Sequence, residues 1–174
     1  VEISEYASEE ARKKFGDSKV ITGDFVDLSL PKGYFDVITM VDIVEHVYNT
    51  GDLLKKCQYL LKPGGLLVIV TPDIGGLLHK CFRGYWPHFD NAHVTYFSIK
   101  SIKTILELKG FRSFRALNFK KALNFYYIRG VILANCSMPL IFLAEVLNIL
   151  IPETLKRKTV FLSCGEIIIV AQKK

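Results

Sequence analysis

The chain has 174 residues, half of them hydrophobic and 23% charged, a balance that favours one folded domain and excludes a disordered chain. The net charge of +6 comes without a long basic run interleaved with aromatic residues, so we expect no nucleic acid partner. The four cysteines include no C-x-x-C pair, which argues against a zinc site and for reduced thiols in the cytoplasm.

The first third of the chain predicts a helix between two short strands. Residues 1–3 have the character of a strand end, and Ser4 is a suitable N-cap for the helix that follows. Gly16 is expected to end this helix. Residues 20–22 predict a second short strand, which a Gly-Asp turn closes.

Two buried strands with a helix between them form the strongest pattern. Residues 35–41 (FDVITMV) are an apolar, β-branched run, typical of a parallel strand covered on both faces. Asn49 or Thr50 can cap the next helix, which residues 62–65 (KPGG) end. Residues 66–70 (LLVIV) predict the second strand. Ligands bind beyond the carboxyl ends of such strands, so a site is expected in the turns that follow them.

The next part of the chain predicts a long loop, a helix and two strands. The loop, residues 73–98, holds three of the four histidines and many aromatic residues, and loops of this length are usually functional. Ser98 can cap a helix that runs to about Lys109. Residues 111–117 and 166–172 predict the last two strands.

An apolar insertion, residues 119–163, separates these two strands. Within it, residues 131–151 are apolar enough to suggest a membrane span, but Glu145 would be costly inside a bilayer. We expect a single helix or a hairpin, with three alternatives for its environment: cover for the domain or a subunit contact, an interfacial position on a membrane, or a true span. The flanking basic residues that suit an anionic interface are Lys120, Lys121, Arg129, Lys156, Arg157 and Lys158.

The succession FDVI, DIVEHV, LLKKCQYLLKPGG and LLVIVTPD closely resembles class I S-adenosylmethionine-dependent methyltransferases. The likeness covers roughly residues 1–115 and the last strand. The likeness is greatest to the branch of the family that has E-H after one strand and L-K-P-G-G before the next. The segment WPHFDNAHVTYFS resembles one in methyltransferases that are similar to the quinone-biosynthesis O-methyltransferases. The resemblance implies an α/β, Rossmann-like sheet, mostly parallel with an antiparallel last strand, and S-adenosylmethionine as cofactor.

The family's first strand and glycine-rich loop have no counterpart in this chain. We therefore expect residues 1–174 to form one N-terminally truncated methyltransferase domain. A glycine-rich loop lets the backbone approach the cofactor closely. The chain alone is accordingly expected to bind S-adenosylmethionine poorly and to show little or no activity as an isolated fragment.

The resemblance also implies a cofactor site made of Glu2, Ile3, Asp24, Phe25, Asp42 and Ile43. In the family an acidic residue in the place of Glu2 holds the ribose hydroxyls, and one in the place of Asp24 accepts a hydrogen bond from the adenine. We expect Glu2 and Asp24 to sit at the tips of neighbouring parallel strands, beside the turn at residues 42–46. The alternatives are an ordinary strand-end glutamate and an ordinary Gly-Asp turn.

His93 and His46 are the candidate catalytic residues on the acceptor side. A histidine near the transferred methyl group can act as a general base toward a hydroxyl. The alternatives are structural: His46 would open the following helix and fix the loop, and His93 would be a core or capping histidine. His88, His93 and Asp90 lack further ligands at a convincing spacing, so we expect no metal.

These observations predict an enzyme that methylates a small or lipid-like acceptor on an oxygen nucleophile. One alternative is a catalytically inactive methyltransferase-like binding module at a membrane, and another is a nicotinamide-dependent reductase with the same type of sheet. We expect a cytoplasmic protein, with peripheral membrane contact or a homo-oligomer through residues 131–151.

Overall fold

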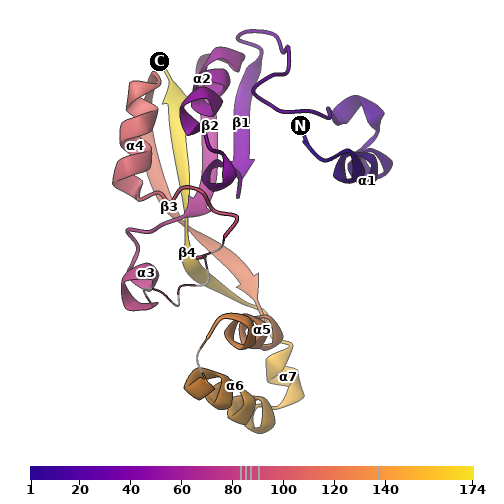
Figure 1. The fold of residues 1–174 in the computed structure, drawn as a ribbon, viewed down its shortest axis with the longest axis vertical. Helices are drawn as coiled ribbons and strands as arrows, with labels where there is room; N and C mark the ends of the chain where they lie inside the picture. The colour runs from indigo at the N-terminus through magenta and orange to yellow at the C-terminus, as the bar shows by residue number, and fades with distance from the viewer. Residues whose placement is uncertain (83, 85, 87, 90, 137) are drawn as a thin grey trace.

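The computed structural model describes residues 1–82, 84, 86, 88–89, 91–136 and 138–174. Its centre is one four-stranded sheet with helices packed against it, and a small N-terminal unit lies to one side (Figure 1). Two of the strands continue below the sheet as a long ribbon that ends in a group of short helices (Figure 1). The molecule is therefore elongated, with the sheet between two outlying parts.

The sheet has the strand order β1-β2-β4-β3. Its strands are β1 (Phe35–Val41), β2 (Leu61–Pro72), β3 (Phe111–Leu123) and β4 (Val160–Lys173). β1 and β2 are parallel, whereas β4 is antiparallel to both of its neighbours. This confirms the expected α/β sheet, with the last strand of the chain placed antiparallel between the two strands that precede it.

Three strands are longer than the sequence pattern suggests. β2 begins at Leu61, and its pairing with β1 shifts before Leu66. The two glycines of the KPGG turn fit this irregularity, since Gly64 has a φ of +77° and a Cβ on Gly65 would lie 3.0–3.1 Å from two backbone oxygens. β3 and β4 pair as far as Leu123 and Val160, so both ends of the segment 119–163 belong to the ribbon.

The helices begin at the expected caps. Ser4, Asn49 and Ser98 each accept a backbone N–H of the following first turn. The α-helices are α1 (Glu5–Phe15), α2 (Thr50–Leu60), α3 (Leu77–Phe82), α4 (Ile99–Leu108), α5 (Phe125–Asn135), α6 (Met138–Leu150) and α7 (Glu153–Lys156). Two single turns of 3-10 helix, η1 (Asp17–Lys19) and η2 (Val44–His46), complete the set.

The hydrophobic core lies between the sheet and the helices α2 and α4. Its fully buried members include Leu54, Cys57, Leu67, Ile102, Leu106 and Phe111. Burying side chains of this size supplies most of the driving force for folding. This core includes Met40 of β1 and Ile69 of β2, so it holds the carboxyl ends of these two strands in place.

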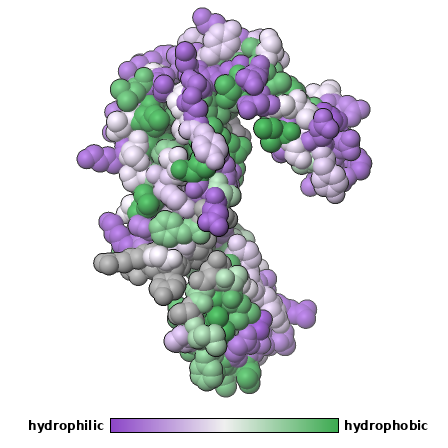
Figure 2. Space-filling model, viewed as in Figure 1, coloured by the Kyte–Doolittle hydropathy of each residue, from purple (hydrophilic) through white to green (hydrophobic). Residues whose placement is uncertain are grey.

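The N-terminal unit touches this core only lightly. Residues 1–3 and 20–22 form one parallel bridge, between Glu2 and Thr22, rather than two full strands. Phe25 packs against the core, and the Lys56 ammonium donates to the Leu28 carbonyl at 2.6 Å. Figure 2 shows open space between this unit and the main body.

The helical segment folds as a hairpin, one of the two forms that the sequence allowed. α5 ends at Asn135 and α6 begins at Met138, and the two helices pack together. Glu145, the residue that argued against a span, forms an ion pair with Arg129 across the hairpin. Among the described residues, no helix has the length and hydrophobicity needed to cross a membrane.

Candidate functional site

A cavity of about 650 Å³ opens where β1 and β2 end. Its polar side is formed by Asp42, Glu45, His46, His93, Lys121 and Glu166. Its apolar side is formed by Leu123, Tyr127, Ile128, Val131, Ile132 and Leu140, from the end of β3 and from α5 and α6. The cavity thus joins the carboxyl edge of the sheet to the helical hairpin. One of its walls is polar and the other is apolar.

The turn after β1 carries the first group of polar residues. Asp42 has a φ of +52°, and its N–H donates to the Val70 carbonyl of β2 at 3.1 Å. A positive φ is uncommon for a residue other than glycine and is often found at functional sites. Asp42 and Ile43 remain exposed, so both can meet a ligand.

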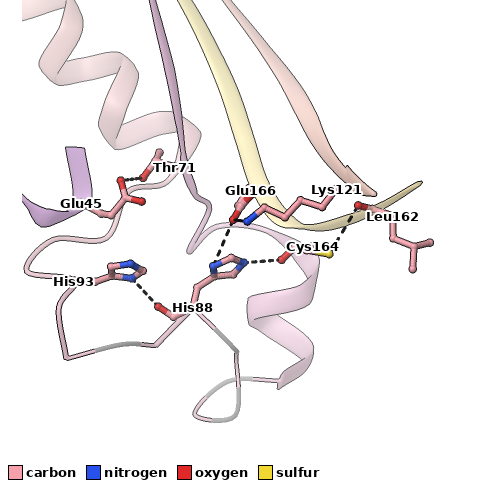
Figure 3. A network of polar contacts seen from close by, with 8 residues as sticks. All are labelled: Glu45, Thr71, His88, His93, Lys121, Leu162, Cys164 and Glu166. Atoms are coloured by element: carbon pink, nitrogen blue, oxygen red, sulfur yellow. Dashed lines mark hydrogen bonds and ion pairs between the residues drawn. The ribbon is translucent and has the colours of Figure 1, made fainter. Parts of the chain in front are cut away.

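Glu45 is the most deeply buried acid of the cavity, with 1% of its surface exposed. Its Oε2 accepts a hydrogen bond from the Thr71 hydroxyl at 3.0 Å, as Figure 3 shows. Its Oε1 is buried and has no hydrogen-bond partner within the described part of the chain. A buried carboxylate oxygen without a donor is energetically costly and calls for an explanation.

Two histidines lie beside this carboxylate. The His46 and His93 rings meet edge to face, with centroids 4.6 Å apart. Nδ1 of His46 donates to the Ala92 carbonyl at 2.9 Å, and Nδ1 of His93 donates to the His88 carbonyl at 2.8 Å. A carbonyl can only accept, so Nδ1 carries the proton in both rings, and Nε2 is left to interact with a ligand.

A third group lies on the β4 side of the cavity. The Lys121 ammonium forms an ion pair with Glu166, which is almost fully buried, and Nδ1 of His88 lies 3.7 Å from the same carboxylate (Figure 3). Burial acts to lower the pKa of Lys121, but the hydrogen bond and the charge of Glu166 outweigh it and raise this pKa above its usual value. Lys121 therefore stays charged at the cavity wall.

Of the six predicted cofactor residues, Asp42 is the one that lines this cavity. Glu2 and Asp24 lie on neighbouring parallel segments, as expected, but in the N-terminal unit beside β1. Each carboxylate caps its own turn, Glu2 by accepting from the Ser4 N–H and Asp24 by accepting from the Val26 N–H, both at 2.9 Å. These are the structural roles given above as alternatives, and they leave further carboxylate lone pairs available.

The remaining predicted residues divide between exposed and packed positions. Ile3 and Ile43 are exposed, whereas Phe25 is half-buried against the core. His88, which is close to His93 in the sequence, donates from Nε2 to the Cys164 carbonyl at 2.9 Å. Asp90, which lies between these two histidines in the sequence, is outside the described residues.

Sequence reasoning missed Thr71, Lys121 and Glu166 as members of the site. Thr71 ends a strand and Glu166 begins a predicted one, which places both at the ligand-binding edge. Lys121 is one of the basic residues that flank the insertion, and no local pattern links it to Glu166.

A sequence profile described as "Methyltransferase domain" matches residues 1–114, about two thirds of the chain. The chain belongs to this family. The expected class, the S-adenosylmethionine-dependent methyltransferases of the Rossmann-like type, is thereby confirmed, and S-adenosylmethionine is the cofactor that this class uses.

Two curated relatives of this methyltransferase domain match short segments. The ubiquinone biosynthesis O-methyltransferase of Bradyrhizobium diazoefficiens is 44% identical over 41 residues, which are 24% of this chain and 16% of that enzyme. A probable S-adenosylmethionine-dependent methyltransferase of Mycobacterium tuberculosis is 26% identical over 73 residues, 42% of this chain and 27% of that protein.

Solved structures show the same fold over nearly the whole methyltransferase domain. A possible histamine N-methyltransferase from Thermotoga maritima matches 98% of this chain and 70% of its own, with a TM-score of 0.63 and 21% identity. A putative methyltransferase from Bacillus halodurans matches 99% of this chain and 80% of its own, with a TM-score of 0.62 and 18% identity. At these identities the likeness concerns the fold alone.

Proposed function

We infer that this methyltransferase domain transfers the methyl group of S-adenosylmethionine to a small or lipid-like acceptor through an oxygen nucleophile. The observation that carries this proposal is the two-sided cavity at the carboxyl ends of β1 and β2. Its polar wall suits a reacting head group, and its apolar wall suits a hydrocarbon tail.

The residues at the end of β1 fit the nucleoside part of the cofactor. Asp42 offers an exposed carboxylate that can accept hydrogen bonds, and Ile43 offers an apolar surface next to it. We propose that Glu2, Asp24 and their neighbours Ile3 and Phe25 complete this site from the N-terminal unit. The bound cofactor supplies an activated methyl group on a good leaving group, so the protein contributes mainly alignment and exclusion of water.

His93 and His46 are proposed to meet the reacting oxygen of the acceptor. Both rings line the cavity, and each has Nδ1 tied to a backbone carbonyl, which fixes its orientation. The free Nε2 of either ring can accept the hydrogen of an acceptor hydroxyl. This arrangement suits an acceptor that gives up a proton, such as a hydroxyl, better than a thioether, which has no proton to give.

The apolar wall sets the expected shape of the acceptor. Ile128, Ile132 and Leu140 lie on the two helices of the hairpin and face the same cavity as the histidines. One curated relative is named for O-methylation in ubiquinone biosynthesis, whereas a structural neighbour is named for N-methylation. The class of reacting atom is therefore the point that the experiment must decide.

The experiment follows labelled methyl groups from S-adenosylmethionine into a panel of matched acceptors, with the cofactor in large excess because this chain is expected to bind it weakly. We expect transfer to a catechol that carries a long alkyl chain, about tenfold less to catechol itself, and none to the matching aniline. The variant Ile132→Asp should remove the preference for the chain, because it places a charge on the apolar wall. Transfer to the amine alone would overturn the proposal. Cofactor binding without transfer to any acceptor would favour the inactive binding module.

A further inference from the structure

We propose that Glu45, His46 and His93 form a binding site for a divalent transition-metal ion. One ligand atom from each of the three residues lies within 4.8 Å of the other two. Ligands bound to a common ion at about 2.1 Å stand roughly 3 to 4 Å apart, so small side-chain rotations would close the site. This inference goes beyond the proposed function and does not rest on it.

The first support is the state of the Glu45 carboxylate. This group is 99% buried, Thr71 satisfies only one of its oxygens, and Oε1 has no hydrogen-bond partner within the described chain. The nearby ammonium of Lys121 is held by Glu166. A bound cation would compensate a buried carboxylate oxygen that has no hydrogen-bond donor.

The second support is the orientation of the two imidazoles. Each donates its Nδ1 proton to a main-chain carbonyl, so each presents the lone pair of Nε2. A hydrogen bond from the other ring nitrogen to a carbonyl or carboxylate is the usual arrangement behind a metal-binding histidine, because it fixes the tautomer and aims the ring. His46 and His93 both have it.

The third support is the way in which the backbone assembles the site. The Glu45 carbonyl accepts the N–H groups of Val94 and Thr95, at 2.9 and 3.1 Å. The contact from His46 to Ala92 spans 46 residues and joins the same two segments. The short turn η2 and the loop that holds His93 are therefore connected whether or not an ion is present.

The donor set indicates the kind of ion. Two imidazoles and one carboxylate suit Zn²⁺, Mn²⁺, Fe²⁺ or Co²⁺, whereas Ca²⁺ and Mg²⁺ prefer oxygen ligands. Three protein ligands leave coordination positions open, and all three ligand residues line the cavity. A hydroxyl bound there would release its proton to solvent more readily, and the ion, which occupies Nε2 of both histidines, would then replace them as the group that activates it.

The sequence did not suggest this site because its ligands are far apart in the chain. The earlier expectation of no metal considered His88 with His93 and Asp90, which are neighbours in the sequence. In the structure His88 turns toward Glu166 and Cys164, and His93 instead meets His46.

The test measures metal binding directly and needs no methyl transfer. The full chain is stripped with a chelator and titrated with Zn²⁺ in a calorimeter, then with Co²⁺ while its visible absorption is recorded. We expect one ion per chain, bound at micromolar concentration or tighter. The variants Glu45→Gln and His93→Asn should each weaken binding by at least tenfold and lose the Co²⁺ absorption.

His79→Gln is the matched control, because it removes an imidazole that lies outside the trio. It should bind Zn²⁺ as the wild type does. Circular dichroism melting checks that each variant folds, and saturating Zn²⁺ should raise the melting temperature of the wild type and of the control only. The proposal is overturned if the wild type shows no binding below about 1 mM, or if the control loses binding as the two variants do.

Discussion

Glu166 shows how one buried charge is neutralised at the edge of this site. Its carboxylate is 2% exposed and relies on Lys121, whose side chain is 30% exposed, with His88 at a longer distance. The Oε2 atom of Glu166 has no partner of its own among the described residues. The ion pair therefore matters for stability as well as for the shape of the cavity.

Lys121→Met should lower the free energy of unfolding by about 2 kcal/mol. The figure is smaller than for a fully buried pair because the ammonium is partly solvated. Urea denaturation measures it. The double variant Lys121→Met with Glu166→Gln should recover part of the loss, because it removes the charge that the single variant leaves unpaired. A double variant less stable than the single one would contradict this account.

Cys57 should make the stability of the protein fall at alkaline pH. Cys57 lies on the side of α2 that packs in the hydrophobic core, and this burial raises the pKa of its thiol from the usual 9.0 to about 12. The contribution of the buried thiol to the free energy of unfolding is fully present below pH 9, where the thiol is still protonated in the unfolded chain. It is lost as the pH rises from 9 toward 12, at about 1.4 kcal/mol per pH unit.

Urea unfolding at several pH values between 8 and 10.5 checks this prediction. In the variant Cys57→Ala the free energy of unfolding should fall less steeply with pH than in the wild type, because the titrating thiol is gone. The cavity that the substitution creates lowers stability by the same amount at every pH. Equal slopes would show that Cys57 does not titrate differently in the two states.

The start of α4 allows a prediction at the level of a whole element. Ser98 accepts the Ser101 N–H at 3.1 Å, and the Ser101 hydroxyl accepts the Ser98 N–H at 2.9 Å. Ser98→Ala should cost about 1 kcal/mol of stability, because it leaves a first-turn N–H without an acceptor. Ser98→Asp keeps a hydrogen-bond acceptor, so its free energy of unfolding should stay within a few tenths of a kcal/mol of the wild-type value. Thermal or urea unfolding distinguishes the two.

The predictable elements are those with a local cause. The caps at Ser4, Asn49 and Ser98 follow from side chains that compete for nearby N–H groups, and the strand at residues 35–41 follows from an apolar run. The extension of β3 and β4 to Leu123 and Val160 depends on the two strands pairing with each other. Local sequence carries little trace of such pairing.

The candidate site divides in the same way. Asp42, Glu45 and His46 follow a strand directly, so their place at the ligand-binding edge could be predicted. The meeting of His46 with His93, and of Lys121 with Glu166, depends on tertiary contacts between distant segments. Glu45 is half of the E-H pair that the sequence shows after a strand, but its unsatisfied oxygen is visible only in the structure.

At the scale of the whole molecule, the N-terminal unit and the sheet are weakly connected. Val37 and Val41 of β1 are about half exposed, although the apolar pattern of this strand suits burial on both faces. Glu2 and Asp24 belong to the N-terminal unit, and an open space separates that unit from the main body (Figure 2). The proposed cofactor residues are therefore not held together by continuous sheet.

The 174-residue chain should accordingly bind S-adenosylmethionine only weakly. We expect a dissociation constant near 1 mM by saturation-transfer NMR, since loosely joined groups must be ordered when the ligand binds. Asp42→Ala should abolish the remaining signal, whereas Asp27→Ala, which removes another exposed carboxylate, should not. Micromolar binding would show that the two parts already form a complete site.

The exposed face of the helical hairpin is the other large-scale feature. Apolar side chains gather on the lower lobe in Figure 2, and those most exposed on α6 are Met138, Phe142, Leu143, Ile149 and Leu150. Arg157 and Lys158 follow directly after α7 and are also exposed. Patches of this kind usually mark an interaction site, and cations beside apolar residues suit an anionic membrane surface.

We therefore propose that this face docks on anionic membranes, where a lipid-like acceptor would be found. The full chain should sediment with vesicles of phosphatidylcholine and phosphatidylglycerol, less so with phosphatidylcholine alone, and less at high salt. The double variant Phe142→Glu with Ile149→Glu should lower the bound fraction roughly tenfold, because it adds two negative charges to the docking face. Leu108→Glu, an equally exposed apolar site on α4, is the control and should bind as the wild type does. Sedimentation as a dimer that the double variant dissociates, with no vesicle binding by the wild type, would instead assign this face to a second copy of the chain.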